Sequence, residues 1–418
     1  MKNKTKIIII MTILIILLLI GCVTGVLMYK HNQRQEKIKI DQETKENKIK
    51  SHYSKFVKTN KKAKIYNCES NEAVGIFGAG VETTLKEIKI NYETKYFVIN
   101  EFEEEYCISY SDVEPIEKLT EKNNRYKLYI PFNENVVTNE KTDFYDSENN
   151  LVYSFNKSYE FPIIIKDSDK YYVELNNQLL YVKNDSVKEI KSSNNSSEAK
   201  ASEVSVLCYH AIYDPNTETC DNIICHTEKQ FNEHMSYLNT NDYMTLKMDE
   251  FEMFIDGMLN IPKKSVLVTI DDGVMGLRAI PILEKNQTQA TMFLVTSWFS
   301  KEQFQSDYLE LHSHSHNLHN QYECPGYGTQ GSALLCKDHD YLVNDLKTSR
   351  ERLDNSKAFC YPYYDYSDHA IAAIKDAGFT MAFAGGRVKA KIGADKYKIP
   401  RYTILSYDTI HTLASIID

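Results

Sequence analysis

The stretch "SVLVTIDDG", residues 265–273, decides the fold of the C-terminal half of this chain. Its apolar and β-branched residues are typical of a strand that is buried on both faces. Packing does not explain why such a strand ends in two acids, and strand geometry points Asp271 and Asp272 in different directions. The two carboxylates can therefore perform different tasks, although an ordinary strand-to-turn transition at Asp-Gly would also give this pattern.

Apolar segments of the same kind recur on both sides of this stretch, and amphipathic segments such as 228–241 and 339–355 lie between them. The other apolar segments are "VSVLCYHAI" (204–212), "ATMFLVT" (290–296), "AFCYPYY" (358–364) and "TMAFAGG" (380–386). Strand alternating with helix predicts an α/β domain with a mostly parallel sheet, such as a (β/α) barrel. Catalytic groups are then expected at the carboxyl ends of the strands.

Histidines cluster in "HSHSHNLHN", residues 312–320, which holds four of the 12 histidines of the chain. Neutral imidazole is the commonest metal ligand among side chains, so the cluster indicates a metal site. A solvated His-rich loop is the alternative interpretation. A separate histidine, His210, lies near the end of the strand predicted at 204–212. A lone histidine is more often structural than catalytic, so spacing alone assigns it no role.

The N-terminus predicts a membrane anchor. Residues 7–29 form an apolar run of 23 residues without a charge, long enough to span a bilayer as a helix. The stretch "LIGC" (19–22) also fits a bacterial lipoprotein signal, with Cys22 as the lipidated residue. Because the chain stays apolar beyond Cys22, an uncleaved single-pass anchor is the preferred interpretation, and both alternatives place the rest of the chain outside the cytoplasm.

Composition limits the possible partners and the number of domains. The 418 residues, 42% of them hydrophobic, suffice for two or three domains. The net charge of -9 argues against nucleic acid as a partner, because phosphate contacts need a basic face. The sequence predicts these parts: 1–29, cytoplasmic tip and transmembrane anchor; 30–56, charged stalk; 57–192, β-rich region; 193–203, polar linker; 204–418, catalytic domain.

The β-rich region contains a weak internal repeat. The motif "KYFV" (95–98) returns as "KYYV" (170–173), each within alternating strands and turn-forming residues. An offset of about 75 residues is too long for a solenoid and suits two small barrels. The pattern resembles a pair of bacterial SH3-like domains, a resemblance that carries no catalytic residue.

Eight of the nine cysteines lie outside the apolar run. Cys220 with Cys225 and Cys324 with Cys336 are close enough in sequence to bridge local loops, and Cys68 is a candidate partner for Cys107. An oxidising compartment permits these bonds, whereas free buried thiols are the alternative.

Four motifs of the C-terminal half together resemble the polysaccharide deacetylases, carbohydrate esterase family 4, whose catalytic unit is the NodB-homology domain. The motif "TIDDG" resembles T-F-D-D-G, and "SHSHNLH" resembles the histidine motif of the circularly permuted poly-N-acetylglucosamine deacetylase branch. In the same branch "VLCYH" resembles V-L-M-Y-H, and "YPYY" resembles Y-P-Y-G. The match covers about residues 204–405 and implies a distorted (β/α) barrel.

The resemblance also implies a metal site. Asp272 corresponds to the carboxylate ligand, and the histidine spacing of five in this branch selects His314 and His319. The spacing of four in most of the family would select His312 and His316 instead. Two imidazoles and one carboxylate suit Zn2+, with Co2+, Ni2+ or Fe2+ as alternatives, and leave positions open for water and substrate.

The remaining roles follow from the same resemblance. Asp271 corresponds to the general base, His210 to the general acid, and Tyr363 to the residue whose backbone N–H holds the oxyanion. Two departures stand out: Tyr364 replaces the expected glycine, and Cys360 replaces the arginine that orients the base in most members. Arg401 is the candidate replacement for that arginine. The loop 321–340 is either a wall of the substrate groove or an inert insertion.

The implied function is metal-dependent N-deacetylation of N-acetylglucosamine residues in a cell-wall polysaccharide, with peptidoglycan preferred. A poly-N-acetylglucosamine exopolysaccharide is the alternative substrate. An inactive wall-binding protein is a second hypothesis, supported by the changes at Cys360 and Tyr364. A metal phosphohydrolase is a third, against which stands the lack of a phosphate-binding glycine loop. The expected location is the cell membrane, with the catalytic domain extracytoplasmic.

Overall fold

The computed structural model describes most of the chain and divides it into two compact units. The described residues are 2–53, 55–90, 95–101, 104–120, 122, 124–319, 324 and 332–418. The first unit comprises 1–122, 138–159 and 175–188. The second comprises 123–137, 160–174 and 189–418.

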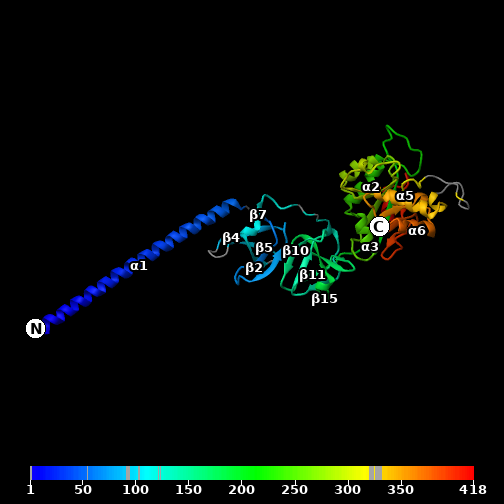
Figure 1. Ribbon diagram of the computed structural model, residues 1–418. Coiled ribbons are helices and arrows are strands. Elements are labelled where there is room, and N and C mark those ends of the chain that lie inside the picture. The colour runs from blue at the N-terminus through cyan, green and yellow to red at the C-terminus, as the bar shows by residue number, and fades with distance from the viewer. Residues whose placement is uncertain are drawn as a thin grey trace. The chain divides into compact units, whose positions relative to one another are not determined.

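The chain begins with one long helix, α1 (Lys2–His52), which includes the apolar run and most of the charged stalk (Figure 1). Its apolar side chains are exposed, Leu18 to 69% and Met28 to 71%, because nothing in the protein covers them. By length and composition α1 can cross a membrane, a test that a signal sequence passes as well.

The rest of the first unit is all-β, as its alternating sequence predicts. Its strands follow one another in the sheet in this order: β14 (Gln178–Lys183), β9 (Thr142–Tyr145), β10 (Leu151–Phe155), β3 (Ala73–Phe77), β2 (Ala63–Asn67), β6 (Glu104–Ser109), β5 (Lys95–Glu101), β4 (Glu82–Ile90), β1 (Phe56–Thr59) and β7 (Val113–Ile116). Aromatic side chains fill the core, with Phe77 edge-on to Tyr153 and Phe144 edge-on to Phe155. The assignment to SH3-like barrels stays a prediction.

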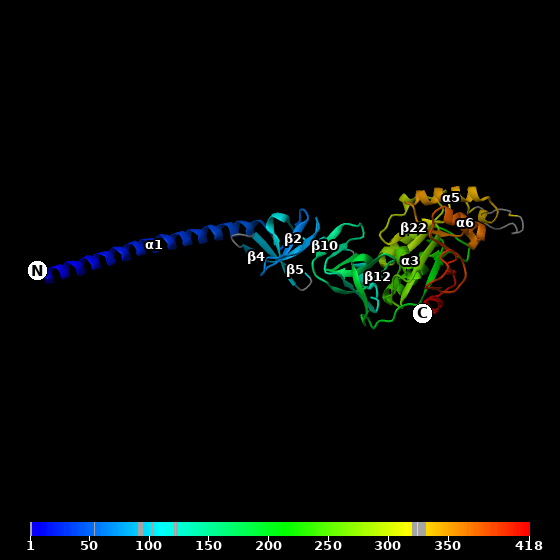
Figure 2. The same cartoon turned by 60° about the horizontal axis from the view of Figure 1, so that its bottom comes forward.

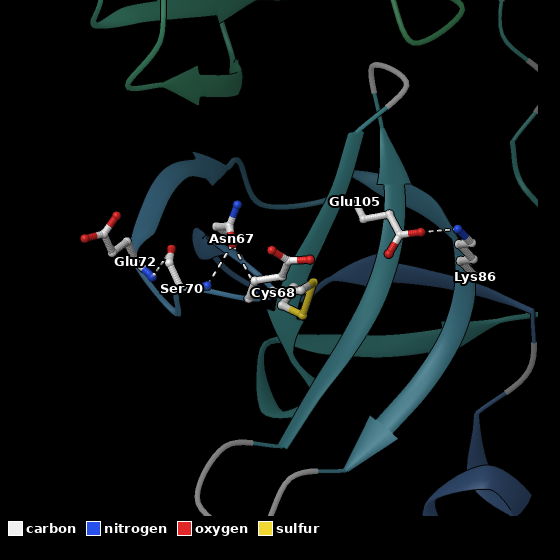
Figure 3. The surroundings of a disulfide bond; sticks show 8 residues. Asn67, Cys68, Ser70, Glu72, Lys86 and Glu105 are labelled. Atoms are coloured by element: carbon white, nitrogen blue, oxygen red, sulfur yellow. Dashed lines mark hydrogen bonds and ion pairs between the residues drawn. A yellow bond between two sulfur atoms is a disulfide. The ribbon is translucent and has the colours of Figure 1, made fainter.

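All three predicted disulfides are present. In the first unit, the disulfide between Cys68 and Cys107 joins the turn after β2 to strand β6. Figure 3 shows this bond and the turn that begins at Asn67. The side chain of Asn67 accepts hydrogen bonds from the backbone N–H groups of Glu69 and Ser70 and so fixes this turn. Two further bonds lie in the second unit: Cys220–Cys225 and Cys324–Cys336. Half of the loop predicted at 321–340 (residues 321–323 and 325–331) lies outside the described residues.

The second unit begins earlier in the chain than the predicted catalytic domain. It takes in β12 (Ile165–Lys166), β13 (Lys170–Leu175), most of β8 (Glu134–Thr138) with β11 (Glu160–Pro162), and part of β15 (Val187–Ser192). Several contacts join these early segments to the rest of the second unit. The backbone N–H of Ile130 donates to the carbonyl of Asn260 at 3.0 Å, and that of Lys166 donates to the carbonyl of Met258 at 2.9 Å. Arg125 donates two hydrogen bonds to the buried carboxylate of Glu250, at 2.5 and 2.6 Å. The Tyr129 hydroxyl donates to the same carboxylate at 2.7 Å.

The centre of the second unit is the predicted, mostly parallel sheet. Its strands follow the order β24 (Met381–Phe383), β23 (Ala358–Cys360), β22 (Leu309–Ser313), β21 (Ala290–Leu294), β20 (Ser265–Asp272), β16 (Glu203–Tyr209) and β25 (Ala390–Lys391). The short strands β19 (Met244–Thr245) and β26 (Tyr402–Thr403) pair with β20 and β16. Closure of this sheet into a barrel stays a prediction.

Helices surround this sheet. They are α2 (Glu228–Thr240), α3 (Met248–Ile255), α4 (Ala279–Lys285), α5 (His339–Arg352), α6 (Asp368–Asp376) and α7 (Ile410–Ile417). Helices α5 and α6 lie side by side (Figure 2), and their apolar faces bury Leu342, Leu346 and Ile374. Parallel pairing places Tyr209 beside Ile270 and Leu294 beside Ser313, so the carboxyl ends of β16, β20, β21 and β22 lie along one edge of the sheet.

We expect Leu207→Ala, in the fully buried strand β16, to lower the free energy of unfolding of the second unit by about 2–5 kcal/mol. Trp298 is the single tryptophan of the chain and lies in this unit, so its fluorescence during urea unfolding reports this unit alone. Leu277→Ala is the matched control, because Leu277 is 50% exposed. An equal effect of both substitutions would contradict the described core.

Candidate metal and catalytic site

Strand β20 ends in a tight turn that separates its two acids. Asp271 pairs with Phe293 in the sheet, whereas Asp272 has a φ of 73° and Gly273 a φ of 92°, both in the left-handed region. Asp tolerates this conformation better than most residues. At Gly273 a Cβ atom would lie 2.5 Å from the side chain of Leu294, so only glycine fits. The turn therefore directs the carboxylates of Asp271 and Asp272 into different surroundings.

Asp272 faces two histidines. Its Oδ1 lies 3.2 Å from Nε2 of His314 and 3.0 Å from Nε2 of His319. The three ligand atoms all lie within 4.8 Å of one another, a spread that one metal ion can bridge. Burial opposes ionisation, but the interactions with His314 and His319 outweigh it and hold the pKa of Asp272 well below its usual value.

The protonation of His314 shows that this donor set fits a cation. Nδ1 of His314 lies 2.8 Å from the carbonyl oxygen of Cys360, which can only accept, so Nδ1 carries the proton. In a neutral imidazole the lone pair of Nε2 then points at Asp272. A lone pair facing a carboxylate is repulsive unless a proton or a cation lies between them, and a His-His-Asp set suits Zn2+.

The backbone of the histidine motif is held by Asp345, on α5. Its carboxylate accepts hydrogen bonds from the N–H groups of His316 and Asn317, both at 2.8 Å. Ser315 adopts a φ of 76°, and this bend places His314 and His319 on the same side of the loop. Asp345 was not predicted as a site residue; the available signal was an acid on the apolar face of the helix predicted at 339–355.

The other two histidines of the motif point elsewhere. His312 is buried, its Nδ1 accepts the backbone N–H of Ala358 at 3.3 Å, and burial lowers its pKa to about 4. His316 contacts the hydroxyl of Thr296 at 3.1 Å. The structure therefore brings His314 and His319, which are five residues apart, to Asp272. It does not bring His312 and His316, which are four residues apart, to this carboxylate.

Asp271 faces a buried arginine. Nη1 and Nη2 of Arg401 donate to its two carboxylate oxygens at 2.7 and 2.8 Å, and the Arg401 side chain is completely buried. Two thiols, Cys208 at 3.4 Å and Cys360 at 3.3 Å, donate to Oδ2 of the same carboxylate. Arg401 thus occupies the position that the sequence suggested, beside the acid expected to be the base.

The pKa of Asp271 results from opposing effects. Burial raises it, but the charge and the hydrogen bonds of Arg401 outweigh burial and lower the pKa to about 2. A ring nitrogen of His210 and a carboxylate oxygen of Asp271 lie within 4.8 Å of each other. Although more than 60 residues separate His210 from the acids in sequence, parallel pairing of β16 with β20 brings them to one place.

The segment after β23 turns sharply at two tyrosines. Tyr363 and Tyr364 have φ values of 59° and 61°, which for bulky residues is strained backbone. The N–H of Tyr363 has no acceptor among the described residues, whereas its hydroxyl donates to the carbonyl of His319 at 2.7 Å. Tyr364 thus takes a left-handed backbone at the position where the resemblance led us to expect glycine.

The side chain of Tyr364 packs beside the buried pair of Arg401 and Asp271. Its hydroxyl lies 2.5 Å from that of Thr403 and 3.5 Å from the thiol of Cys208, and its ring packs against the guanidinium of Arg401 at 5.3 Å. This packing offsets part of the strain. Trp298, also not predicted as a site residue, stands edge-on to His319 at 4.9 Å and is 42% exposed.

Comparison with known proteins covers the part of the chain that holds this site. Residues 259–382 match the sequence model of the polysaccharide deacetylase family. The poly-beta-1,6-N-acetyl-D-glucosamine N-deacetylase of Staphylococcus aureus (strain MSSA476) is 26% identical over 200 residues, which are 43% of this chain and 67% of that protein. The family match includes both acids, His314, His319 and Tyr363; His210 and Arg401 lie outside it.

Two solved structures are similar at lower identity. The de-N-acetylase from Aggregatibacter actinomycetemcomitans is 22% identical, with a TM-score of 0.46, covering 51% of this chain and 100% of that one. IcaB from Ammonifex degensii is 19% identical, with a TM-score of 0.44, covering 53% of this chain and 99% of that one.

We expect His314→Ala and His319→Ala to lose bound divalent metal, because each removes one of three converging ligands. His312→Ala and His316→Ala are matched controls from the same loop and should retain it. Elemental analysis of the four proteins after dialysis against Zn2+ makes the comparison. If His312→Ala and His316→Ala lost the metal and the other two variants kept it, the histidine pair with a spacing of four would be the correct one.

The buried pair of Arg401 and Asp271 generates a second prediction. Arg401→Met leaves a buried carboxylate unpaired and should destabilise the second unit by about 3–5 kcal/mol. The double variant Asp271→Asn, Arg401→Met removes the unpaired charge and should be clearly more stable than Arg401→Met alone. Urea unfolding followed by Trp298 fluorescence measures both. Equal stability of the single and double variants would contradict this prediction, because the unpaired carboxylate of Asp271 would then cost nothing in Arg401→Met.

Proposed function

We propose that this chain, whose C-terminal unit contains a polysaccharide deacetylase domain, hydrolyses the acetamido groups of N-acetylglucosamine residues in an extracytoplasmic polysaccharide. The observation that carries the proposal is the different surroundings of two adjacent acids. Asp272 converges with His314 and His319, and Asp271 is held by Arg401. One carboxylate is thereby free to bind a cation while its neighbour accepts a proton.

Asp272, His314 and His319 would hold the metal. Zn2+ is the first candidate, and Co2+, Ni2+ and Fe2+ suit the same ligands. When bound, such an ion supplies Lewis acidity to the amide oxygen and to water. The protein contributes the fixed directions of the ligands, which the hydrogen bond from His314 to the carbonyl of Cys360 maintains.

Asp271 is proposed as the general base. Its low pKa keeps it ionised, and the two-pronged contact with Arg401 fixes the direction of its oxygens. Asp271 would take a proton from the attacking water, whose oxygen forms the new bond to the amide carbon. The strong pairing makes Asp271 a weak base, so the geometry of the site, more than its basicity, has to promote the transfer.

His210 and Tyr363 are proposed to complete the reaction. The free N–H of Tyr363 would donate to the oxygen of the tetrahedral intermediate, where negative charge develops. His210 would give its proton to the nitrogen as the carbon–nitrogen bond breaks, so that acetate and a glucosamine residue are released. The exposed indole of Trp298 offers an apolar face beside His319 against which a sugar ring can pack.

A poly-N-acetylglucosamine is the first candidate substrate, because the name of the S. aureus relative specifies such a polymer. Peptidoglycan, the substrate preferred from the sequence alone, is the second candidate. The apolar helix α1 favours it, since an anchor there would keep the domain close to the cell wall. In this proposal α1 is an uncleaved membrane anchor, and the β-rich region connects it to the catalytic unit along the chain.

The proposal is tested by acetate release from both polymers, with metal content measured on the same samples. Asp272→Asn should lose metal and activity together, whereas Asp271→Asn should keep the metal and lose turnover. His210→Ala should keep the metal and lose about two to four orders of magnitude in rate, which is the usual contribution of a general acid.

Two outcomes would contradict this assignment of roles. Near-normal turnover of Asp271→Asn would remove the base from the mechanism. Metal binding without acetate release from either polymer would favour the alternative of an inactive wall-binding protein. His411→Ala is the control for the acid, because His411 lies in the exposed first turn of α7 and should be dispensable.

A further inference from the structure

Two buried cysteines beside Asp271 have no role in the proposed reaction. Six of the nine cysteines form disulfides, and Cys22, Cys208 and Cys360 are free. Cys208 and Cys360 are both completely buried, and each directs its thiol at Oδ2 of Asp271. The other six cysteines outside the apolar run form disulfides, whereas these two remain thiols in contact with the candidate base.

Cys208 belongs to a second group of converging ligand atoms. Its Sγ lies 3.4 Å from Oδ2 of Asp271 and 4.0 Å from Nδ1 of His210, and the three ligand atoms lie within 4.8 Å of one another. Ligands of zinc lie about 2.0–2.3 Å from the ion, so two of them are at most about 4.6 Å apart. The group is therefore close to the geometry that a single ion requires.

We infer that Cys208, His210 and Asp271 form a second cation site, which takes a thiophilic divalent ion such as excess Zn2+ or Cd2+ and stops the deacetylase. The inhibition, but not the site, rests on the function proposed above. The ligand set is distinct from Asp272, His314 and His319, with which it shares no residue.

The thiol hydrogen bond marks where the ion would lie. The Sγ–H of Cys208 donates to Oδ2 of Asp271, so a proton already bridges these two atoms. An ion at that place replaces the proton: the sulfur–hydrogen bond breaks, one proton leaves to water, and thiolate and carboxylate share the ion. Burial raises the pKa of the Cys208 thiol, so only an ion with high affinity for sulfur can displace that proton.

Occupancy would disable the acid and the base together. An ion on Oδ2 of Asp271 occupies the oxygen lone pair that would accept the proton of water. An imidazole nitrogen that binds an ion cannot also hold a proton, so His210 could no longer act as the protonated acid. His210 is only partly buried, which gives an ion access to the otherwise buried group.

Cys360 provides a matched control. Its Sγ lies as close to Asp271 as that of Cys208, at 3.3 Å, but its converging group is Asp271 with His314. His314 is also a ligand of the first site, so a loaded first site excludes an ion from the Cys360 group. With that first site filled, the second ion should depend on Cys208 and not on Cys360.

The experiment uses the full-length protein in detergent, with Cys22→Ser in every sample and one equivalent of Zn2+ loaded. Cd2+ is titrated while ultraviolet thiolate-to-cadmium absorbance, cadmium per chain and acetate release are followed. The parent should bind one further ion with thiolate absorbance and lose activity as it binds. In Cys208→Ser the absorbance should vanish, and half-inhibition should need at least about tenfold more Cd2+. Cys360→Ser should behave as the parent.

Cys208→Ala is a second variant, because alanine removes the thiol without adding volume or another ligand atom. The inference would be overturned if Cys208→Ser and Cys208→Ala kept the absorbance and the inhibition of the parent, or if Cys360→Ser lost both. The absorbance and the cadmium content decide the site even if neither polymer releases acetate, so failure of the proposed function is distinguishable from failure of the second site.

Discussion

The buried ion pair between Arg401 and Asp271 is the interaction on which the rest of the site depends. A carboxylate that is only 2% exposed stays ionised only if an opposite charge with good hydrogen-bond geometry accompanies it. Arg401 supplies both, although it follows Asp271 by 130 residues. With Asp271 held in this way, Asp272 turns toward the histidines, and two neighbours of identical chemistry acquire different surroundings.

Strand pairing supplies the remaining parts of the site. Parallel strands place their carboxyl ends along one edge, so His210, the two acids and the histidine motif meet although they are far apart in sequence. The strained tyrosines after β23 persist because packing around Tyr364 and the hydrogen bond of Tyr363 to His319 hold them. Local strain is thereby concentrated at the turn that borders the site.

Part of this arrangement could be predicted from sequence. Apolar runs that end in functional residues predicted the strands, and the motif resemblance selected the His314 and His319 pair that converges with Asp272. The buried contacts of Cys208 and the role of Asp345 could not be predicted, because they depend on which side chains meet across strands and helices. The contact of Arg125 with Glu250 could not be predicted for the same reason, because the two residues lie 125 positions apart in sequence.

The central claim is that Asp272, His314 and His319 together hold one metal ion. Anomalous diffraction from crystals of the protein soaked in a low concentration of Zn2+ tests it most directly. The account predicts one strong anomalous peak within bonding distance of Oδ1 or Oδ2 of Asp272 and of Nε2 of both histidines. A peak bound by His312 or His316 instead, or no peak at Asp272, would contradict it.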